Sequence, residues 1–180
     1  MEENIKIWLK EGKQSKITKL IKKLVSKFSG NDFEKIGSIL NWMDKSLKRC
    51  EDYKKVIKIF ARRNVNKVLE DGFTTGCHDN ALVFATLCRA VGIPAKYIMG
   101  IDKLNPKNKG HCVVEAYINE GWIIVDQNRK AISLDIKRSD FYRKNYIVGK
   151  GLDSWDIGIK SFKNWKEKSN EVIKIISKIN

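Results

Sequence analysis

The chain has 180 residues, of which 42% are hydrophobic, and this is enough for one domain with a buried core. Lysine and arginine (36) outnumber aspartate and glutamate (21), so the net charge is +15 and the surface can attract nucleic acid, anionic lipid or acidic protein. The basic residues are spread along helical segments without an arginine-rich tract. A lysine-rich solvated surface is therefore the simpler interpretation, and a nucleic-acid role is not favoured.

Charged residues interrupt the N-terminal stretch "MEENIKIWLKEGK", which therefore lacks the continuous apolar centre of a signal peptide. No other stretch approaches the length of a transmembrane helix. We therefore expect a cytoplasmic protein whose cysteines stay free thiols, although their number is even. These cysteines are Cys50, Cys77, Cys88 and Cys112.

The first third of the chain predicts helices on a lysine-rich background. Apolar residues recur at helical spacing over residues 17–28. A second helix is predicted over residues 31–47, because Asn31 and Glu34 have the spacing of a capping box. A third helix is predicted from about residue 52 to residue 69.

The pattern changes after Gly72. The segment "HDNALVFATLCRA" is apolar around most of its circumference, which predicts a buried central helix that begins at Cys77 or His78. Gly92 supplies the C-terminal stop of this helix, and Pro94 prevents its continuation.

A strand meander is predicted next. The segments "AKYIMGI", "HCVVEAYI" and "WIIVD" have the composition of strands, and the last two are joined across Asn119–Glu120–Gly121. The segment "LNPKNKG" is a polar loop between the first two, and the tail from about Phe162 to Ile179 returns to helix. The order of helices, buried helix, strands and helix predicts an α+β fold.

Cys77 stands where the polar loop meets the buried helix. A thiol at a helix start lies beside unpaired backbone N–H groups and the positive end of the helix dipole, and both favour the nucleophilic thiolate. The same N–H groups can stabilise an oxyanion. The alternative is a small buried core residue, which is our interpretation of Cys88 inside the apolar helix.

The chain has only two histidines that can act as a base for Cys77. His78 is adjacent in sequence, and successive helical residues point about 100° apart, so direct pairing with Cys77 is awkward. His111 lies at the start of a predicted strand, directly after a loop, where its side chain can reach the edge of a cleft. His111 is therefore the better candidate, although it can also be a simple loop-exit residue.

A carboxylate partner for His111 depends on the hairpin turn. If the turn has two residues, Asp126 falls on the strand face that carries His111, diagonal to it or two pairs away. Asp126 can then hold one imidazole nitrogen and orient the other toward Cys77. A three-residue loop would put Asp126 on the other face, and an ordinary turn former is the alternative interpretation of this residue. The opposite face is wholly apolar: Cys112, Val114, Ala116, Ile118, Ile123 and Val125.

The segments "TGCHDNALVFATLCRAVGIPAKYIMGI" and "GHCVVEAYINEGWIIVDQNR" together resemble the core of the transglutaminase-like superfamily, whose fold is related to papain-like cysteine proteases. The resemblance covers about residues 72–129, and the chain resembles the small prokaryotic members of the superfamily. It implies that Cys77 is the nucleophile, His111 the base and Asp126 the orienting carboxylate. It also implies a buried helix that carries the cysteine at its N-terminus and an antiparallel sheet that carries the histidine and the aspartate.

The resemblance implies a single transglutaminase-like domain over residues 1–180. We expect a helical part over 1–70, a catalytic core over 72–130, and a C-terminal extension with a helix over 131–180.

The sequence departs from the family pattern at two places. Members often have "HAW" or "HVW" at the histidine, where this chain has "HCV", and a proline after the aspartate, where this chain has Gln127. Neither departure changes a triad residue. The second oxyanion donor is expected upstream of Cys77, near Thr74 and Thr75.

The leading hypothesis is a cysteine-dependent acyl-transfer enzyme, either a protease- or amidase-like hydrolase or a transamidase, that acts through an acyl-thioester on a protein, peptide or other amide or ester. No calcium loop of alternating acidic ligands is present, and we expect no cofactor.

Two alternatives stay open at this point. The first is a non-catalytic binding module of the same fold, whose basic surface engages an acidic protein or nucleic acid. The second is a metal site formed by Cys77–His78 and His111–Cys112, which the spacing of these pairs does not favour.

Overall fold

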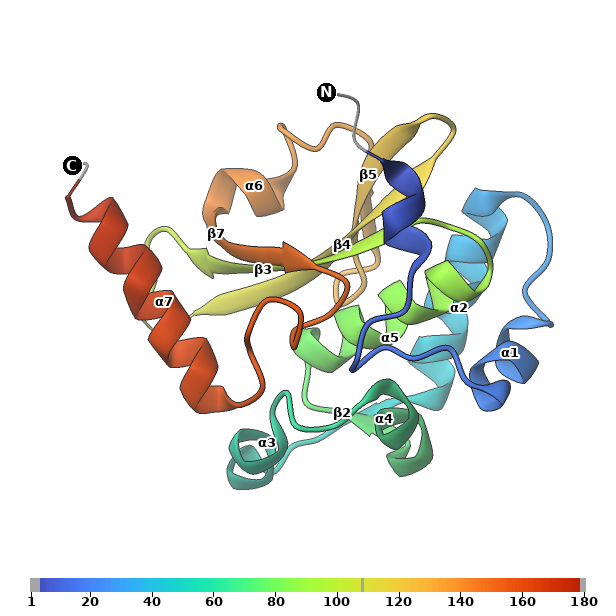
Figure 1. Cartoon of the computed structure of the whole chain (residues 1–180), viewed down its shortest axis with the longest axis horizontal. Helices are drawn as coiled ribbons and strands as arrows, with labels where there is room; N and C mark the ends of the chain where they lie inside the picture. Colours follow the sequence, from blue (N-terminus) through green and yellow to red (C-terminus); the bar gives the residue numbers. More distant parts are fainter. Residues whose placement is uncertain (1–3, 108, 179–180) are drawn as a thin grey trace.

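The computed structural model describes residues 4–107 and 109–178, and Figure 1 shows a central sheet with most helices on one of its faces. The helices are the short 3-10 helix η1 (Ile5–Leu9) and the α-helices α1 (Lys19–Val25), α2 (Asp32–Ser46), α3 (Tyr53–Ile59), α4 (Val65–Asp71), α5 (Cys77–Ala90), α6 (Asp140–Lys144) and α7 (Phe162–Ile176). The strands are β1 (Lys48–Arg49), β2 (Phe73–Thr74), β3 (Ala95–Asp102), β4 (Gly110–Ile118), β5 (Gly121–Asp126), β6 (Ala131–Ser133) and β7 (Asn145–Gly151).

The main sheet has the strand order β6-β5-β4-β3-β7, and every neighbouring pair in it is antiparallel. A separate parallel pair joins β1 to β2. The helices and the antiparallel meander confirm the predicted α+β fold.

Helix α5 is the centre of the core. Its residues from Ala81 to Cys88 are all buried, as the apolar pattern predicts, and it packs against β3 and β4 on one side and α1, α2 and α4 on the other. The predicted apolar face of the β4–β5 hairpin, from Cys112 to Val125, lies in the same core cluster. Because the first turn of α5 adjoins this core, the position of Cys77 is fixed by packing.

The β4–β5 turn has two residues. Ile118 pairs with Gly121, and Asn119 and Glu120 have φ values of 47° and 62°, which is the left-handed geometry of a type I′ hairpin turn. This register places Asp126 on the face of His111, diagonally across the two strands. The condition on which the placement of Asp126 depended, a turn of two residues, is therefore met.

The N-terminal helices form as predicted, with one correction. Asn31 and Glu34 make the capping box at the start of α2, and the helix predicted over 17–28 is the shorter α1. The single helix predicted over 52–69 is wrong, because the chain breaks into α3 and α4. Ala61 has a φ of 56° between them, and the Asn64 side chain caps a new helix by accepting from the N–H of Lys67.

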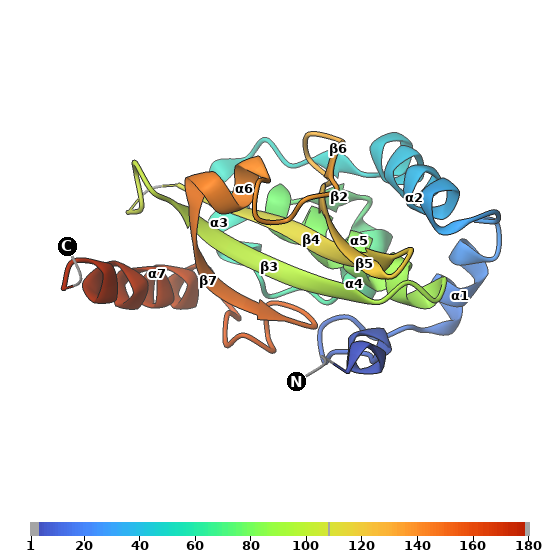
Figure 2. The ribbon, with the colours of Figure 1, turned by 90° about the horizontal axis from the view of Figure 1, so that it is seen from above.

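The chain between Asp126 and Phe162 contains β6, α6 and β7, for which the sequence predicted no element. Helix α6 covers the face of the sheet opposite α5 (Figure 2), where its Phe141 packs in a small second core with Ile98, Val113 and Ile124. Helix α7 lies at the β7 edge (Figure 1) and starts at the predicted Phe162. The predicted end at Ile179 lies outside the described residues.

Candidate active site

The loop before α5 is shaped by the side chain of Asp79, two residues after Cys77. Asp79 Oδ2 accepts the backbone N–H of Thr75 at 2.8 Å and also contacts the Arg63 guanidinium. Gly76 between them has a φ of 112°, a conformation that favours glycine. The helix therefore starts at Cys77 with its thiol beside the first backbone N–H groups of α5.

His111 and Asp126 are in direct contact. His111 Nε2 lies 2.8 Å from Asp126 Oδ2, while Asp126 Oδ1 accepts the backbone N–H groups of Asn128 and Arg129. Because Nε2 faces the carboxylate, Nδ1 is the imidazole nitrogen that remains for Cys77. Asp126 is held from two sides and orients the ring.

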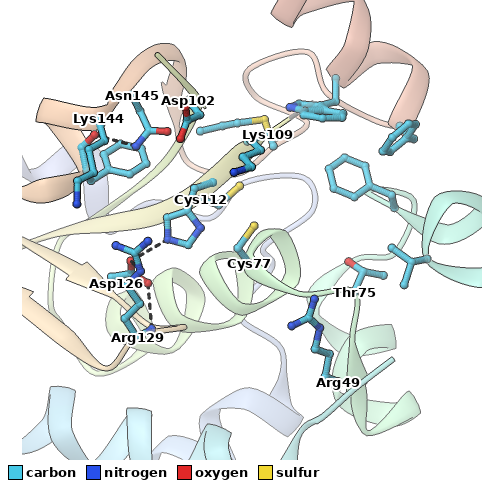
Figure 3. Close-up of a pocket in the computed structure, with 18 of the residues that line it drawn as sticks. Arg49, Thr75, Cys77, Asp102, Lys109, Cys112, Asp126, Arg129, Lys144 and Asn145 are labelled. Atoms are coloured by element: carbon cyan, nitrogen blue, oxygen red, sulfur yellow. Dashed lines mark hydrogen bonds and ion pairs between the residues drawn. The ribbon is translucent and has the colours of Figure 1, made fainter. Parts of the chain in front are cut away.

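The thiol of Cys77 is surrounded by groups that favour its ionised form. A hydrogen bond with the Cys112 thiol is the largest influence, and together with a hydrogen bond and positive charge from His111 it lowers the pKa of Cys77 well below its usual value, against the effect of burial. Cys77 and Cys112 point toward one another in Figure 3. Burial and the neighbouring Cys77 raise the pKa of Cys112, which therefore stays a protonated donor.

The imidazole shows the opposite shift. Burial lowers the pKa of His111, but hydrogen bonds and attraction from Asp126 and Cys77 outweigh it and raise the pKa to about 9. Burial also raises the pKa of Asp126, and the hydrogen bond and charge of His111 lower it below its usual range. These shifts favour the charged forms of the three groups, a Cys77 thiolate beside a His111 imidazolium and an Asp126 carboxylate.

These three side chains line a cavity of about 800 Å³, and Figure 3 labels Cys77 and Asp126 on its wall. Charged residues from the end of β3, the β3–β4 loop and α6 line another part, including Asp102, Lys109, Asp140 and Lys144. Thr75 also lines it, and its Oγ1 is buried without a hydrogen-bond partner among the described residues. The cavity therefore gives a substrate access to the cysteine and the histidine together.

The other candidate base, His78, and the other core cysteine considered, Cys88, are buried. His78 is buried, with its Nδ1 3.0 Å from Asp79 Oδ1 and its ring against Phe60. Cys88 is buried in the core, and desolvation raises its pKa, as expected of an inert thiol. In residues 4–107 and 109–178, no group of three or more His, Cys, Asp or Glu side chains is arranged to hold a metal ion.

Residues 19–127 match a family model that is described as the transglutaminase-like superfamily. The match covers more than half of the chain and includes Cys77, His111 and Asp126. The chain belongs to the transglutaminase-like superfamily.

Individual relatives of this transglutaminase-like chain are distant. An uncharacterized protein of Haemophilus influenzae is 26% identical over 91% of this chain and 48% of its own length. A candidate cysteine protease from Cytophaga hutchinsonii, solved by crystallography, shares the fold with a TM-score of 0.62 and 22% identity, over 87% of this chain and 50% of that one. A solved structure described as a TGase is 18% identical with a TM-score of 0.47, over 68% of this chain and 34% of that one. The chain thus spans about half the length of the first two relatives.

Gln127, which stands where family members often have proline, contacts the backbone of both Cys77 and Cys112. Its Nε2 donates to the backbone oxygen of Cys112 at 2.9 Å and lies 3.4 Å from that of Cys77. The end of β5 is thereby linked to the start of both β4 and α5. Sequence reasoning missed this role, because Gln127 seemed only to replace a proline.

No helix in the described part of this transglutaminase-like chain is both long enough and apolar enough to cross a membrane.

Proposed function

We propose that this transglutaminase-like protein is a cysteine-dependent acyl-transfer enzyme that acts through Cys77, His111 and Asp126. The observation that carries the proposal is geometric: Cys77, His111 and Asp126 line one cavity, and His111 Nε2 lies 2.8 Å from Asp126 Oδ2. The lowered pKa of Cys77 and the raised pKa of His111 support it. Perturbed titratable groups in one cavity are a frequent property of catalytic sites.

In the proposed reaction, the Cys77 thiolate attacks the carbonyl carbon of an amide or ester and forms a tetrahedral oxyanion. The His111 imidazolium then gives its proton to the leaving nitrogen or oxygen, the bond to that atom breaks, and an acyl-thioester remains on Cys77. Water or an amine, deprotonated by His111, attacks the thioester and releases the product and the thiolate. Asp126 keeps the ring oriented in both steps.

The oxyanion needs two donors near Cys77. The backbone N–H of Cys77, at the first position of α5, is one candidate, because helix start positions lack intrahelical partners. The Thr75 hydroxyl is the other, because its buried Oγ1 has no partner within the described residues and borders the cavity. This proposal refines the expectation of a donor near Thr74 and Thr75.

The proposed chemistry predicts an acyl-enzyme with a simple activated ester. With p-nitrophenyl acetate at pH 7, we expect a burst of nitrophenolate and an acetyl group on Cys77, located by peptide mass mapping. Cys77→Ala should abolish both signals, whereas Cys50→Ala, which removes another partly exposed thiol on the lining of the same cavity, should leave the acetyl group on Cys77. A wild-type protein that forms no acetyl-thioester would contradict the proposal and favour the binding-module alternative.

The oxyanion assignment makes a separate prediction. Thr75→Val removes the hydroxyl at nearly constant volume and should slow acylation by p-nitrophenyl acetate about 10²-fold. Alkylation of Cys77 by iodoacetamide passes through no oxyanion and should change little. Thr75→Ser keeps a hydroxyl and is the matched control. Equal slowing of acylation in the valine and serine variants would show that the hydroxyl is not the donor.

A further inference from the structure

One wall of the cavity is aromatic, and the catalytic triad does not account for it. Phe60, at the end of α3, and Phe162 and Trp165, in the first turn of α7, all line the cavity. Their ring centroids are 5.1 to 6.2 Å apart, within the range of favourable aromatic pairs. Phe162 and Trp165 lie outside residues 19–127, which match the family, whereas Phe60 lies inside them, so the aromatic wall joins the family core to α7.

Trp165 reaches to the residue before the catalytic histidine. A Cβ atom on Gly110 would lie 3.0 Å from Cζ2 and 3.2 Å from Nε1 of the indole, so a side chain there would displace the ring. The glycine in "GHCVV" therefore lets Trp165 lie against the start of β4, beside His111.

The indole nitrogen of Trp165 has no hydrogen-bond acceptor among residues 4–107 and 109–178. The residue is only 7% exposed, and its Nε1 is buried without a hydrogen-bond partner in the parts of the chain that the structure describes. A buried N–H donor without an acceptor is costly, and a ligand oxygen would recover that free energy. An orphan donor on the lining of a cavity therefore indicates a ligand that carries an acceptor.

Helix α7 is held against the site at several points. Ser161 caps its N-terminus, and Lys166 Nζ donates to the backbone oxygen of Lys107 in the β3–β4 loop at 2.6 Å. Phe162 also packs edge-on against Phe60, at an interplanar angle of 86°. The aromatic wall is therefore a preformed surface, as small-ligand sites usually are.

We infer that the aromatic wall of Phe60, Phe162 and Trp165 is a subsite for an apolar side chain of a peptide substrate, and that Trp165 Nε1–H donates to a carbonyl oxygen of the same peptide. The inference rests on the proposed function and specifies its substrate class. Apolar rings select an apolar group, and the neighbouring indole N–H selects a carbonyl oxygen beside it. The charged part of the cavity, with Asp102, Lys109 and Asp140, suits neither role.

The test uses two reagents with the same electrophile and the same backbone, N-iodoacetyl-phenylalanine amide and N-iodoacetyl-glycine amide. Alkylation of Cys77 is followed by peptide mass mapping, with iodoacetamide as the reference reagent. We expect the phenylalanine reagent to react about tenfold faster than the glycine reagent, since an apolar pocket discriminates by this order for small groups. Phe162→Ala and Trp165→Ala should bring the ratio of the two rates close to one.

Two further variants test whether the aromatic ring or the N–H of Trp165 is responsible, and whether the effect is specific to the cavity. Trp165→Phe keeps an aromatic ring, so it should keep a preference for phenylalanine but lower the rates of both peptide reagents relative to iodoacetamide. Phe33→Ala removes an exposed phenylalanine of α2 and should leave the ratio unchanged. If the Trp165 variants do not fold, Phe162→Ala decides the test, because Phe162 is only partly buried.

The failures of the two proposals are distinguishable. A wild-type ratio near one, with fast reaction of iodoacetamide at neutral pH, would overturn the aromatic subsite and leave the proposed function standing. Reaction of iodoacetamide at the rate of an ordinary thiol would contradict the proposed function and the subsite with it.

Discussion

His111→Ala is expected to slow acylation of Cys77 by p-nitrophenyl acetate at pH 7 by about 10²- to 10⁴-fold, the usual contribution of a positioned general acid and base. The variant removes the proton donor for the leaving group. It also removes the hydrogen bond and the positive charge by which His111 lowers the pKa of Cys77. The contribution of Cys112 remains, so the pKa of Cys77 should rise only part of the way toward its usual value.

The pH dependence of the wild type follows from the two shifts. Activity should rise as Cys77 ionises, at a pH well below the usual pKa of a thiol, which is about 8.5. It should stay level while thiolate and imidazolium coexist, and fall above about pH 9, where His111 loses its proton. In His111→Ala the alkaline fall should disappear, and the rise in alkylation by iodoacetamide should move to higher pH.

Two controls distinguish chemistry from damage to the fold. Added imidazole should restore part of the activity of His111→Ala, since it can enter the vacated space as a soluble base. Lys130→Ala changes an exposed residue that pairs with Asp44, neither of which lines the cavity, and should behave as the wild type. If the pH dependence of alkylation in His111→Ala were identical to that of the wild type, the proposed pairing of His111 with Cys77 would be contradicted.

The close arrangement of His111 and Asp126 could be predicted from the sequence because it depends on local geometry. Strand residues alternate between faces, and a two-residue turn fixes the register, so positions fifteen apart in the chain can be placed relative to one another. The turn itself is formed by Asn119 and Glu120 at positive φ, and its length was the one condition that the prediction named. The catalytic roles of the residues remain predictions.

The break between α3 and α4 could not be predicted, because its causes are distant in sequence. The apolar residues keep helical spacing across the break, so periodicity alone indicates one helix. In the structure, the indole N–H of Trp155 donates to the backbone oxygen of Ala61 at 2.6 Å, from 94 residues further along the chain. Arg63 turns inward to Asp71 and Asp79. Such contacts outweigh local propensity and leave no short-range signal.

Strand β7 was missed for a related reason. Its segment "NYIVGKG" carries two glycines, which weaken a strand pattern. In the structure they are needed for packing, since a Cβ on Gly149 or Gly151 would meet Ile157. The register also shifts between Met99 and Gly100 of the partner strand β3. The sequence predicts only a helix for the aromatic residues of α7, and only the folded chain places Phe162 and Trp165 on the cavity that His111 also lines.

Arg63→Met is expected to lower the free energy of unfolding by about 3–5 kcal/mol, because it leaves the buried Asp79 without its cation. Arg63 is 7% exposed and contacts Asp71 and Asp79, and one of its nitrogens also donates to the backbone oxygen of Phe73. Burial raises the pKa of Asp79, and hydrogen bonding and charge from His78, with the charge of Arg63, bring it below its usual range. The arginine therefore offsets part of the cost of the buried carboxylate.

Urea denaturation, followed by circular dichroism, measures this loss, and Lys67→Met is the matched control. Lys67 also pairs with Asp71, but its side chain is 57% exposed and solvent screens the pair, so its removal should lower the free energy of unfolding much less than Arg63→Met does. Because the folded-state pKa of Asp79 is lowered, its contribution to stability is present above the unfolded pKa of about 3.9 and is lost as pH falls through the folded value. Since Asp79 also holds the N–H of Thr75, the same variant should slow acylation of Cys77. Equal stability of the Arg63 and Lys67 variants would mean that Asp79 does not depend on the arginine.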